Sequence, residues 1–171
     1  MATGAPFAVL LTHINALPIV CVQSVAVIVQ KEDAMTHKIL CATDGTEHSA
    51  IAVIHAAELS VLTKAPMTIC LVNVAHGGGR GPLINHWPDD EVTKILAEAS
   101  ALAQKHGVKG PETATVHARE ASAGIVHLAE TQGFDHIVMG TGDKRGITRL
   151  VLGSVAADVA GRAHCVVTVA R

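Results

Sequence analysis

Aromatic residues are scarce in this sequence, which has no tyrosine, one tryptophan and two phenylalanines among 171 residues. Proteins that bind single-stranded nucleic acid without sequence preference stack bases on aromatic side chains, so the composition disfavours that class. The 13 lysines and arginines are scattered, and the formal net charge is −2. Because no basic stripe could follow a phosphate backbone, we expect no nucleic-acid partner.

Metal and disulfide motifs are missing as well. The four cysteines form no C-x-x-C pair, and the eleven histidines form no H-E-x-x-H motif or Cys/His cluster at ligand spacing. His48 and His55 are close in sequence but seven residues apart, and we expect them on a helix surface. We therefore expect reduced, buried thiols in a cytoplasmic protein, and no metal site.

The first part of the chain carries little charge. Residues 7–29 are uncharged, and no lysine or arginine precedes Lys31, so the positive region of a secretory signal is missing. The stretch is long enough for a membrane span, but Pro18 and several polar residues interrupt it, so we expect no membrane partner. Patterned sequence begins after Met35. We expect residues 1–34 to be an extension, disordered or not native, and residues 35–171 to form the domain.

Beyond Met35, apolar runs alternate with segments of helical spacing. This alternation predicts an α/β fold with a parallel sheet and right-handed crossovers. Ligands bind such sheets beyond the carboxyl ends of the strands, here near Asp44, Val74 and Gly140. The expected strands are residues 38–43, 67–74, 113–118, 136–140 and 165–169, and the expected helices are residues 46–61, 88–107, 121–131 and 154–162.

The segment after the fourth expected strand favours a phosphate site. It reads MGTGDKRGITRLVLGSVAADV, from residue 139 to residue 159. Glycines let backbone N–H groups approach a phosphate, and Ser154 begins a helix whose N-terminal dipole favours an anion. Lys144, Arg145 and Arg149 add positive charge.

This segment resembles the signature loop of the universal stress protein family, whose ATP-binding members carry G-x2-G-x9-G-(S/T) before a hydrophobic helix. Gly140, Gly153 and Ser154 match its first and last elements. The runs ILCATDGTEHSA and IVMGT are similar to two of the family's strands, and the resemblance covers residues 35–171. It implies a five-stranded parallel sheet of the adenine nucleotide alpha-hydrolase type, with strand order 3-2-1-4-5 and helices on both faces.

The resemblance also implies a function in stress response, through ATP binding and altered conformation or partner choice. It implies a homodimer paired through the last strand, and Mg²⁺ only as the counter-ion of ATP. Asp44 would accept a hydrogen bond from a ribose hydroxyl. Val74 and Met139 would either contact the adenine or serve only the packing of the sheet. The expected cofactor-binding residues are Ala42, Thr43, Asp44, Val74, Met139, Gly140, Gly142, Asp143, Lys144, Arg145, Gly153, Ser154 and Val155, and no catalytic residue is expected.

The chain departs from the family pattern where the second glycine should fall, at Asp143. Its carboxylate would repel a phosphate, unless the loop shifts its phase to Gly142. The alternative function is therefore a family member that binds no nucleotide and acts as an interaction protein. An ATP-using enzyme is a third possibility, but the stretch TDGTEHS lacks the serine-glycine-glycine start of such enzymes. We expect at most slow ATP hydrolysis.

A second glycine run, GGGRG at residues 77–81, lacks the G-x-x-x-x-G-K-[ST] pattern of a phosphate loop. We expect a flexible connection over the ligand cleft there. His86 and Trp87, which follow it, either close over a ligand or anchor the next helix.

Overall fold

The computed structural model describes residues 19–22, 25–28, 37–77, 83–141 and 152–171. The chain divides into two compact units, Met1–Met35 and Thr36–Arg171. In the first unit, strand β1 (Ile19–Val22) pairs antiparallel with β2 (Val25–Ile28). The native status of this extension stays a prediction. Among the described residues, no helix is both long and apolar enough to span a membrane.

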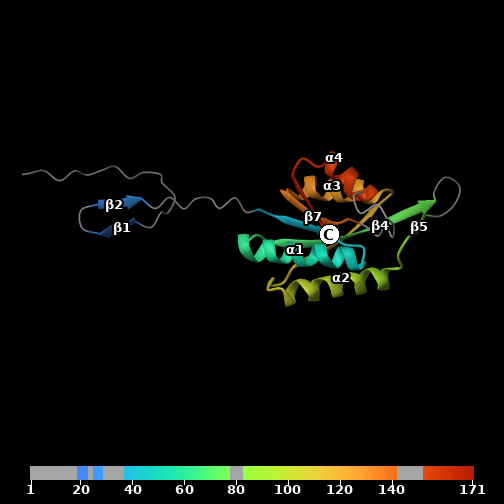
Figure 1. The fold of residues 1–171 in the computed structure, drawn as a ribbon, viewed down its shortest axis with the longest axis horizontal. Helices are drawn as coiled ribbons and strands as arrows, with labels where there is room; N and C mark the ends of the chain where they lie inside the picture. Colours follow the sequence, from blue (N-terminus) through green and yellow to red (C-terminus); the bar gives the residue numbers. More distant parts are fainter. Residues whose placement is uncertain (1–18, 23–24, 29–36, 78–82, 142–151) are drawn as a thin grey trace, which may run out of the picture. The chain divides into compact units, whose positions relative to one another are not determined.

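The second unit is an α/β sandwich (Figure 1). Five strands of its sheet are parallel and run in the order β6-β4-β3-β7-β8. Their bounds are β3 Ile39–Ala42, β4 Met67–Gly77, β6 Glu112–Ala118, β7 His136–Gly140 and β8 Val166–Ala170. The prediction of a mostly parallel sheet is confirmed.

The expected number of five strands is wrong, because the sheet that the described residues form has six. The short strand β5 (Leu83–Asn85) pairs antiparallel with the end of β4, with Ala75 opposite Asn85. The strand order of the whole sheet therefore differs from the expected one by this addition. β4 also runs on to Gly77, three residues beyond its expected end at Val74.

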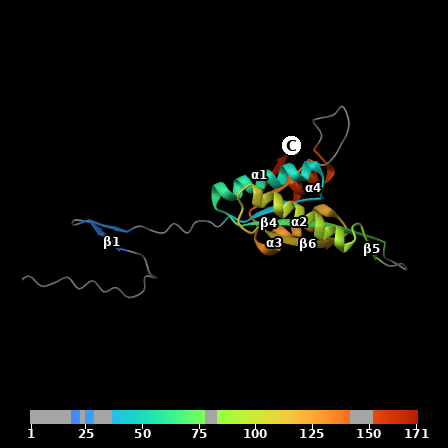
Figure 2. The ribbon, with the colours of Figure 1, turned by 90° about the horizontal axis from the view of Figure 1, so that it is seen from below.

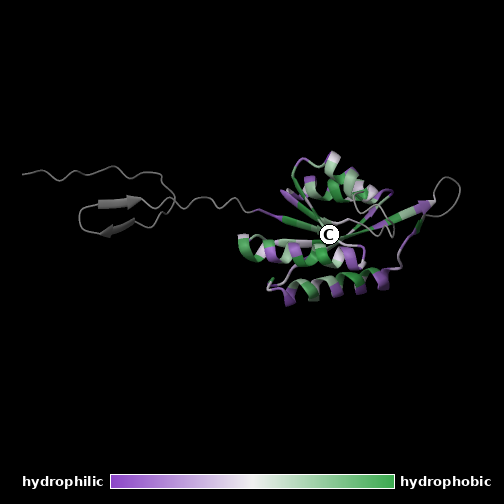
Figure 3. Cartoon of the chain, in the orientation of Figure 1, coloured by the Kyte–Doolittle hydropathy of each residue, from purple (hydrophilic) through white to green (hydrophobic). Residues whose placement is uncertain are grey.

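Helices cover both faces of the sheet (Figure 1), and Figure 2 looks onto the face that α1 and α2 cover. Helices α1 (Glu47–Thr63) and α2 (Asp89–Lys105) pack against one face, and α3 (Ala121–Gln132) and α4 (Ser154–Arg162) against the other. Successive residues of a strand point to opposite faces, so Leu40 packs on the α3 side and Cys41 on the α1 side. Figure 3 shows the resulting apolar sheet between helices whose outer surfaces are more polar, most clearly along α2. Burial on both faces explains the continuous apolar runs in the sequence.

Local sequence sets the ends of the helices. Thr46 caps α1, because its side chain accepts a hydrogen bond from the backbone N–H of Ser49. Pro88 precedes α2, and three acidic residues occupy its first turn, where the helix dipole favours negative charge. Gly133 ends α3 in a left-handed conformation, with φ of 67°.

Candidate functional site

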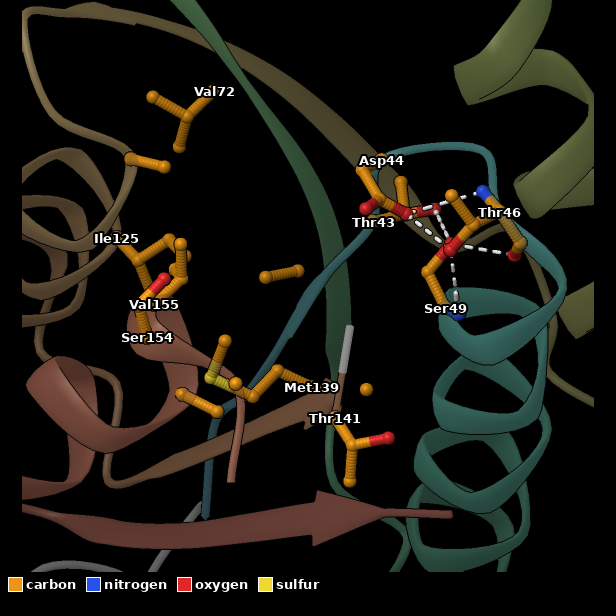
Figure 4. A pocket seen from close by; sticks show the side chains of 15 residues that line it. Thr43, Asp44, Thr46, Ser49, Val72, Ile125, Met139, Thr141, Ser154 and Val155 are labelled. Atoms are coloured by element: carbon orange, nitrogen blue, oxygen red, sulfur yellow. Dashed lines mark hydrogen bonds between the residues drawn. The ribbon is translucent and has the colours of Figure 1, made fainter. Parts of the chain in front are cut away.

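A cavity of about 270 Å³ lies at the carboxyl ends of β3 and β7, beside the first turns of α1 and α4 (Figure 4). In the sheet, β3 lies between β4 and β7, so the crossovers that leave it run in opposite directions. Open α/β sheets bind ligands where the winding reverses in this way. The residues that line the cavity are Ala42, Thr43, Asp44, Thr46, Ser49, Val72, Ala121, Ile125, Met139, Gly140, Thr141, Gly153, Ser154, Val155 and Ala156.

One wall of the cavity is polar and comes from the turn between β3 and α1. The buried Thr43 donates a hydrogen bond from Oγ1 to Ser49 Oγ at 3.1 Å. Ser49 Oγ in turn donates to the carbonyl oxygen of Thr46 at 2.8 Å. These bonds tie the hydroxyl groups of the wall to the first turn of α1, so the wall and the helix start form one structure.

Asp44 supplies the charge on this wall and is exposed to solvent. Its Oδ1 accepts hydrogen bonds from the backbone N–H of Thr46 at 3.1 Å and from Thr46 Oγ1 at 2.7 Å. Both of these bonds orient the carboxylate through the same oxygen. Within the described part of the chain, Oδ2 remains available to accept from a hydroxyl group of a ligand.

The opposite wall is apolar. Figure 4 shows Val72 and Ile125 across the cavity from Asp44 and Thr46, with Met139 between the two sides. Val72 comes from β4, Ile125 from α3 and Met139 from the end of β7. A cavity with one apolar wall and a few directed polar groups suits a ligand that has both a flat apolar part and hydroxyl groups.

The start of α4 forms a third side. Gly153 precedes this helix without any side-chain cap, and the first helical bond runs from the Ala157 N–H to the Gly153 carbonyl at 2.9 Å. The N–H groups of Ser154, Val155 and Ala156 therefore have no partner within the helix. All three residues line the cavity, and their dipoles favour an anion there.

Gly140 and Gly153 differ in what the fold itself requires of them. A Cβ at Gly140 would lie 2.7 Å from the carbonyl oxygen of His48, so this glycine lets α1 pack on the end of β7. Gly153 has φ of −59° and ψ of 151°, a backbone conformation open to any residue. A requirement for glycine at residue 153 would therefore have to come from the ligand.

The structure brings most of the expected site residues together. Ala42, Thr43, Asp44, Met139, Gly140, Gly153, Ser154 and Val155 all line the cavity. Gly142, Asp143, Lys144 and Arg145 lie outside the described residues, so their roles stay predictions.

Val74 is not among the lining residues, whereas Val72, two residues earlier in β4, is. The register of the sheet explains the difference, because Ala42 at the end of β3 lies opposite Cys70. Val72 is only two residues beyond that level, whereas Val74 is four residues beyond it.

Several lining residues were not expected as site residues. Thr46 and Ser49 belong to the capping turn of α1, and hydroxyl side chains at a helix start indicate a cap rather than a ligand site. A cap beside the end of a strand is nevertheless also a cavity wall. Thr141 directly follows Gly140, which was expected. The residues of α3 that line the cavity do so because α3 packs beside segments distant in sequence, and no local pattern reveals this packing. The unexpected lining residues are Thr46, Ser49, Val72, Ala121, Ile125, Thr141 and Ala156.

Trp87 anchors the connection between β4 and α2. The fully buried side chain of Asn73 donates from Nδ2 to the Trp87 carbonyl at 2.8 Å and accepts the Trp87 N–H at Oδ1, at 2.9 Å. The indole packs against the core under α1 and α2, with the His86 ring at 4.6 Å between centroids. Neither His86 nor Trp87 lines the cavity. Of the two roles considered for them, anchoring the helix fits the structure.

Among the side chains that the structure describes, the thiols and histidines offer no second centre for chemistry. Burial raises the pKa of the Cys70 thiol to about 12, and burial, with the neighbouring Cys70, raises the pKa of Cys41 further. Both thiols stay protonated at neutral pH and are therefore poor nucleophiles. His55 is exposed on α1, with Nδ1 3.8 Å from Glu58 Oε2. Across residues 37–77, 83–141 and 152–171, no three His, Cys, Asp or Glu side chains are grouped to hold a metal ion.

Comparisons with known proteins agree with this geometry. The model of the universal stress protein family matches residues 35–171. A universal stress protein of Methanocaldococcus jannaschii is 33% identical over 150 residues, which cover 84% of this chain and 87% of the relative.

Two solved structures share the fold. A universal stress protein in complex with cAMP superimposes with a TM-score of 0.63 at 25% identity, over 79% of this chain and 96% of the other. A universal stress protein from Archaeoglobus fulgidus in complex with dAMP gives a TM-score of 0.56 at 22% identity, over 79% of this chain and 98% of the other. On the strength of the family match and the Methanocaldococcus relative, this chain belongs to the universal stress protein family.

Proposed function

We propose that this protein binds an adenine nucleotide in the cavity between β3 and α4, and that it acts in stress response through altered conformation or partner choice. The observation that carries the proposal is the pair of unlike walls beside the uncapped start of α4. An adenine nucleotide has a flat apolar base, a sugar with hydroxyl groups and an anionic phosphate. Each of these parts has a chemically matching side of the cavity.

In this arrangement the base packs against Val72, Ile125 and Met139. A ribose hydroxyl donates to Asp44, whose carboxylate Thr46 already orients. The phosphate accepts from the N–H groups at the start of α4, and Mg²⁺ enters only as the counter-ion of ATP. The relative in complex with cAMP supports an adenine nucleotide as the ligand class.

A homodimer paired through β8 is part of the proposal. Within the described sheet, β8 hydrogen-bonds only to β7, so its other edge is open to a strand of a second copy. Val166 on this strand is 60% exposed. Light scattering should give twice the mass of one chain, and Val166→Lys should shift the mass toward that of the monomer.

Calorimetric titration with AMP, cAMP and ATP tests the proposed ligand. Val155 lines the cavity at 38% exposure, so Val155→Trp should fill it and abolish binding without disturbing the core. Val61→Trp is the matched control, because Val61 is also a half-exposed helix residue but lies outside the cavity. Equal affinities for Val155→Trp and the wild type would place the site elsewhere.

A second candidate is an interaction protein that binds no nucleotide. It is favoured by Asp143 in the loop and by Asp44, which is the single charged side chain among the described lining residues. If Asp143 opposes the phosphates, Asp143→Gly should tighten ATP binding by about tenfold, most strongly at low salt. If the loop is phased on Gly142, Gly142→Ala should be the damaging change. An absence of binding by the wild type and by Asp143→Gly would favour the interaction protein.

A further inference from the structure

Gly124 allows α3 to approach the sheet unusually closely. It is the fourth residue of α3 and is buried against β4 and β6. A Cβ at this position would lie 2.8 Å from Val72 Cγ1, 3.1 Å from Ala118 Cβ and 3.2 Å from Val116 Cγ1. A separation of 2.8 Å is shorter than carbon atoms tolerate without a shift of one of them. Alanine therefore cannot replace Gly124 unless Val72 or α3 moves.

Val72 connects this contact to the cavity. It stands against Gly124 and also lines the cavity. Its neighbour across the sheet is Val116, which pairs with it in register and also contacts the Gly124 position. The next residue of α3, Ile125, lines the same apolar wall. The position of the Val72 side chain therefore depends on the space left by the missing side chain at residue 124.

We propose that Gly124 is a positioning residue. Because it has no side chain, Val72 can lie close against α3, and this position of Val72 leaves room for the ligand beside the apolar wall of the cavity. This inference rests on the proposed function for the identity of the ligand, although not for the packing itself. An added methyl group would push Val72 toward the cavity more readily than it would lift α3. Lifting the helix would loosen four buried side chains at once, namely Ile125, Val126, Leu128 and Ala129, whereas Val72 needs only a turn or shift of one side chain.

The affinity of AMP for four variants, measured by calorimetry, tests the proposal. Gly124→Ala should weaken binding by about tenfold or more, the effect of one methyl group in a tight pocket. Adding Val72→Ala to that variant removes the displaced atoms, and should restore the affinity to that of Val72→Ala alone. Gly161→Ala in α4 is the control and should bind as the wild type does, because a Cβ there meets no atom within 4 Å.

Two results would overturn the inference. One is a folded Gly124→Ala variant with unchanged affinity, and the other is a double variant that binds AMP more weakly than Val72→Ala alone. If Gly124→Ala fails to fold, a double variant that folds and binds AMP supports the proposal. A double variant that also fails to fold overturns it, because Gly124 would then serve the packing of α3 on Ala118 and Val116.

A crystal structure of Gly124→Ala separates this inference from the proposed function. If the wild type binds no nucleotide, the proposed function fails, and the structure of the variant still tests the packing. Val72 displaced into the cavity over an unmoved α3 would support the inference. An unmoved Val72 under a shifted α3 would overturn it.

Discussion

The backbone of His48 lies directly against Gly140. A Cβ on Gly140 would be 2.7 Å from the His48 carbonyl oxygen and 2.9 Å from its carbonyl carbon. The start of α1, which carries the polar wall of the cavity, thus packs on the end of β7 without an intervening side chain. The contact joins two segments that are about ninety residues apart in sequence and fixes the wall relative to the sheet.

Replacing Gly140 with alanine should destabilise the fold. The added methyl group meets backbone rather than a flexible side chain, so overpacking should lower the free energy of unfolding by about 1–3 kcal/mol. Urea unfolding measures the change. Gly161→Ala, which meets nothing within 4 Å, should not destabilise the protein. A Gly140→Ala variant as stable as the wild type would contradict the close contact.

Asn73 should be needed for stability. Asn73→Ala leaves the N–H and the carbonyl of Trp87 without their partner, which should lower the free energy of unfolding by about 2 kcal/mol or more. Since Trp87 is the single tryptophan, its fluorescence reports both the unfolding and any exposure of the ring. Asn85→Ala, at an exposed asparagine on β5, is the matched control and should change little. Equal losses in the two variants would show that the Asn73 bonds do not stabilise the connection.

Cys41 and Cys70 should resist thiol reagents in the folded protein. Both are fully buried, and burial raises the pKa of each thiol. An Ellman titration at pH 8 should therefore detect Cys165, which is partly exposed, before either of them, and all four cysteines only after unfolding. Prompt reaction of four thiols without denaturant would contradict the buried strands.

The same thiols should make stability fall at alkaline pH. Above a pKa of about 8.5 the thiols of the unfolded chain lose their protons, while the buried thiols keep them because their folded pKa is higher. Each buried thiol then lowers the free energy of unfolding by up to about 1.4 kcal/mol per pH unit. Urea unfolding at pH 8 and pH 10 should show a smaller loss for Cys70→Ala than for the wild type. The same loss in both proteins would contradict this effect.

His136 should make stability fall at acidic pH. Burial lowers the pKa of its imidazole, the charge of Asp135 opposes this effect, and His37 adds to it. The unfolded chain therefore takes up a proton near pH 6.5 more readily than the folded one, and stability is lost as the pH falls below that value. His136 Nε2 lies 2.8 Å from Thr168 Oγ1, and His136→Gln keeps a polar group there. Unfolding between pH 7.5 and pH 5.5 should depend less on pH in the variant, and an equal dependence would contradict the account.

Much of the fold could be predicted from sequence because the signals are local. Asp89, Asp90 and Glu91 after Pro88 indicate a helix start, and the apolar runs of β3 and β4 indicate buried parallel strands. The strand β5 gave no such signal. It has three residues, too few for a period to show, and it follows a glycine run.

Of the site, the sequence predicted mainly the residues that lie at the carboxyl ends of strands. Asp44 and Gly140 stand next to such ends, and both line the cavity. The choice between Val72 and Val74 depends on register between strands, which periodicity does not contain. The tight contacts of Gly140 and Gly124 depend on packing between segments far apart in sequence, so their glycines could not be assigned from local pattern.

Native mass spectrometry of the full chain, in an equimolar mixture of AMP, cAMP and ATP, tests the central claim most directly. The account predicts one adenine nucleotide per chain, with at most a trace on Val155→Trp, whose cavity is filled. The nucleotide that is bound also names the preferred ligand. A wild-type protein that retains its fold and carries none of the three nucleotides would contradict the account.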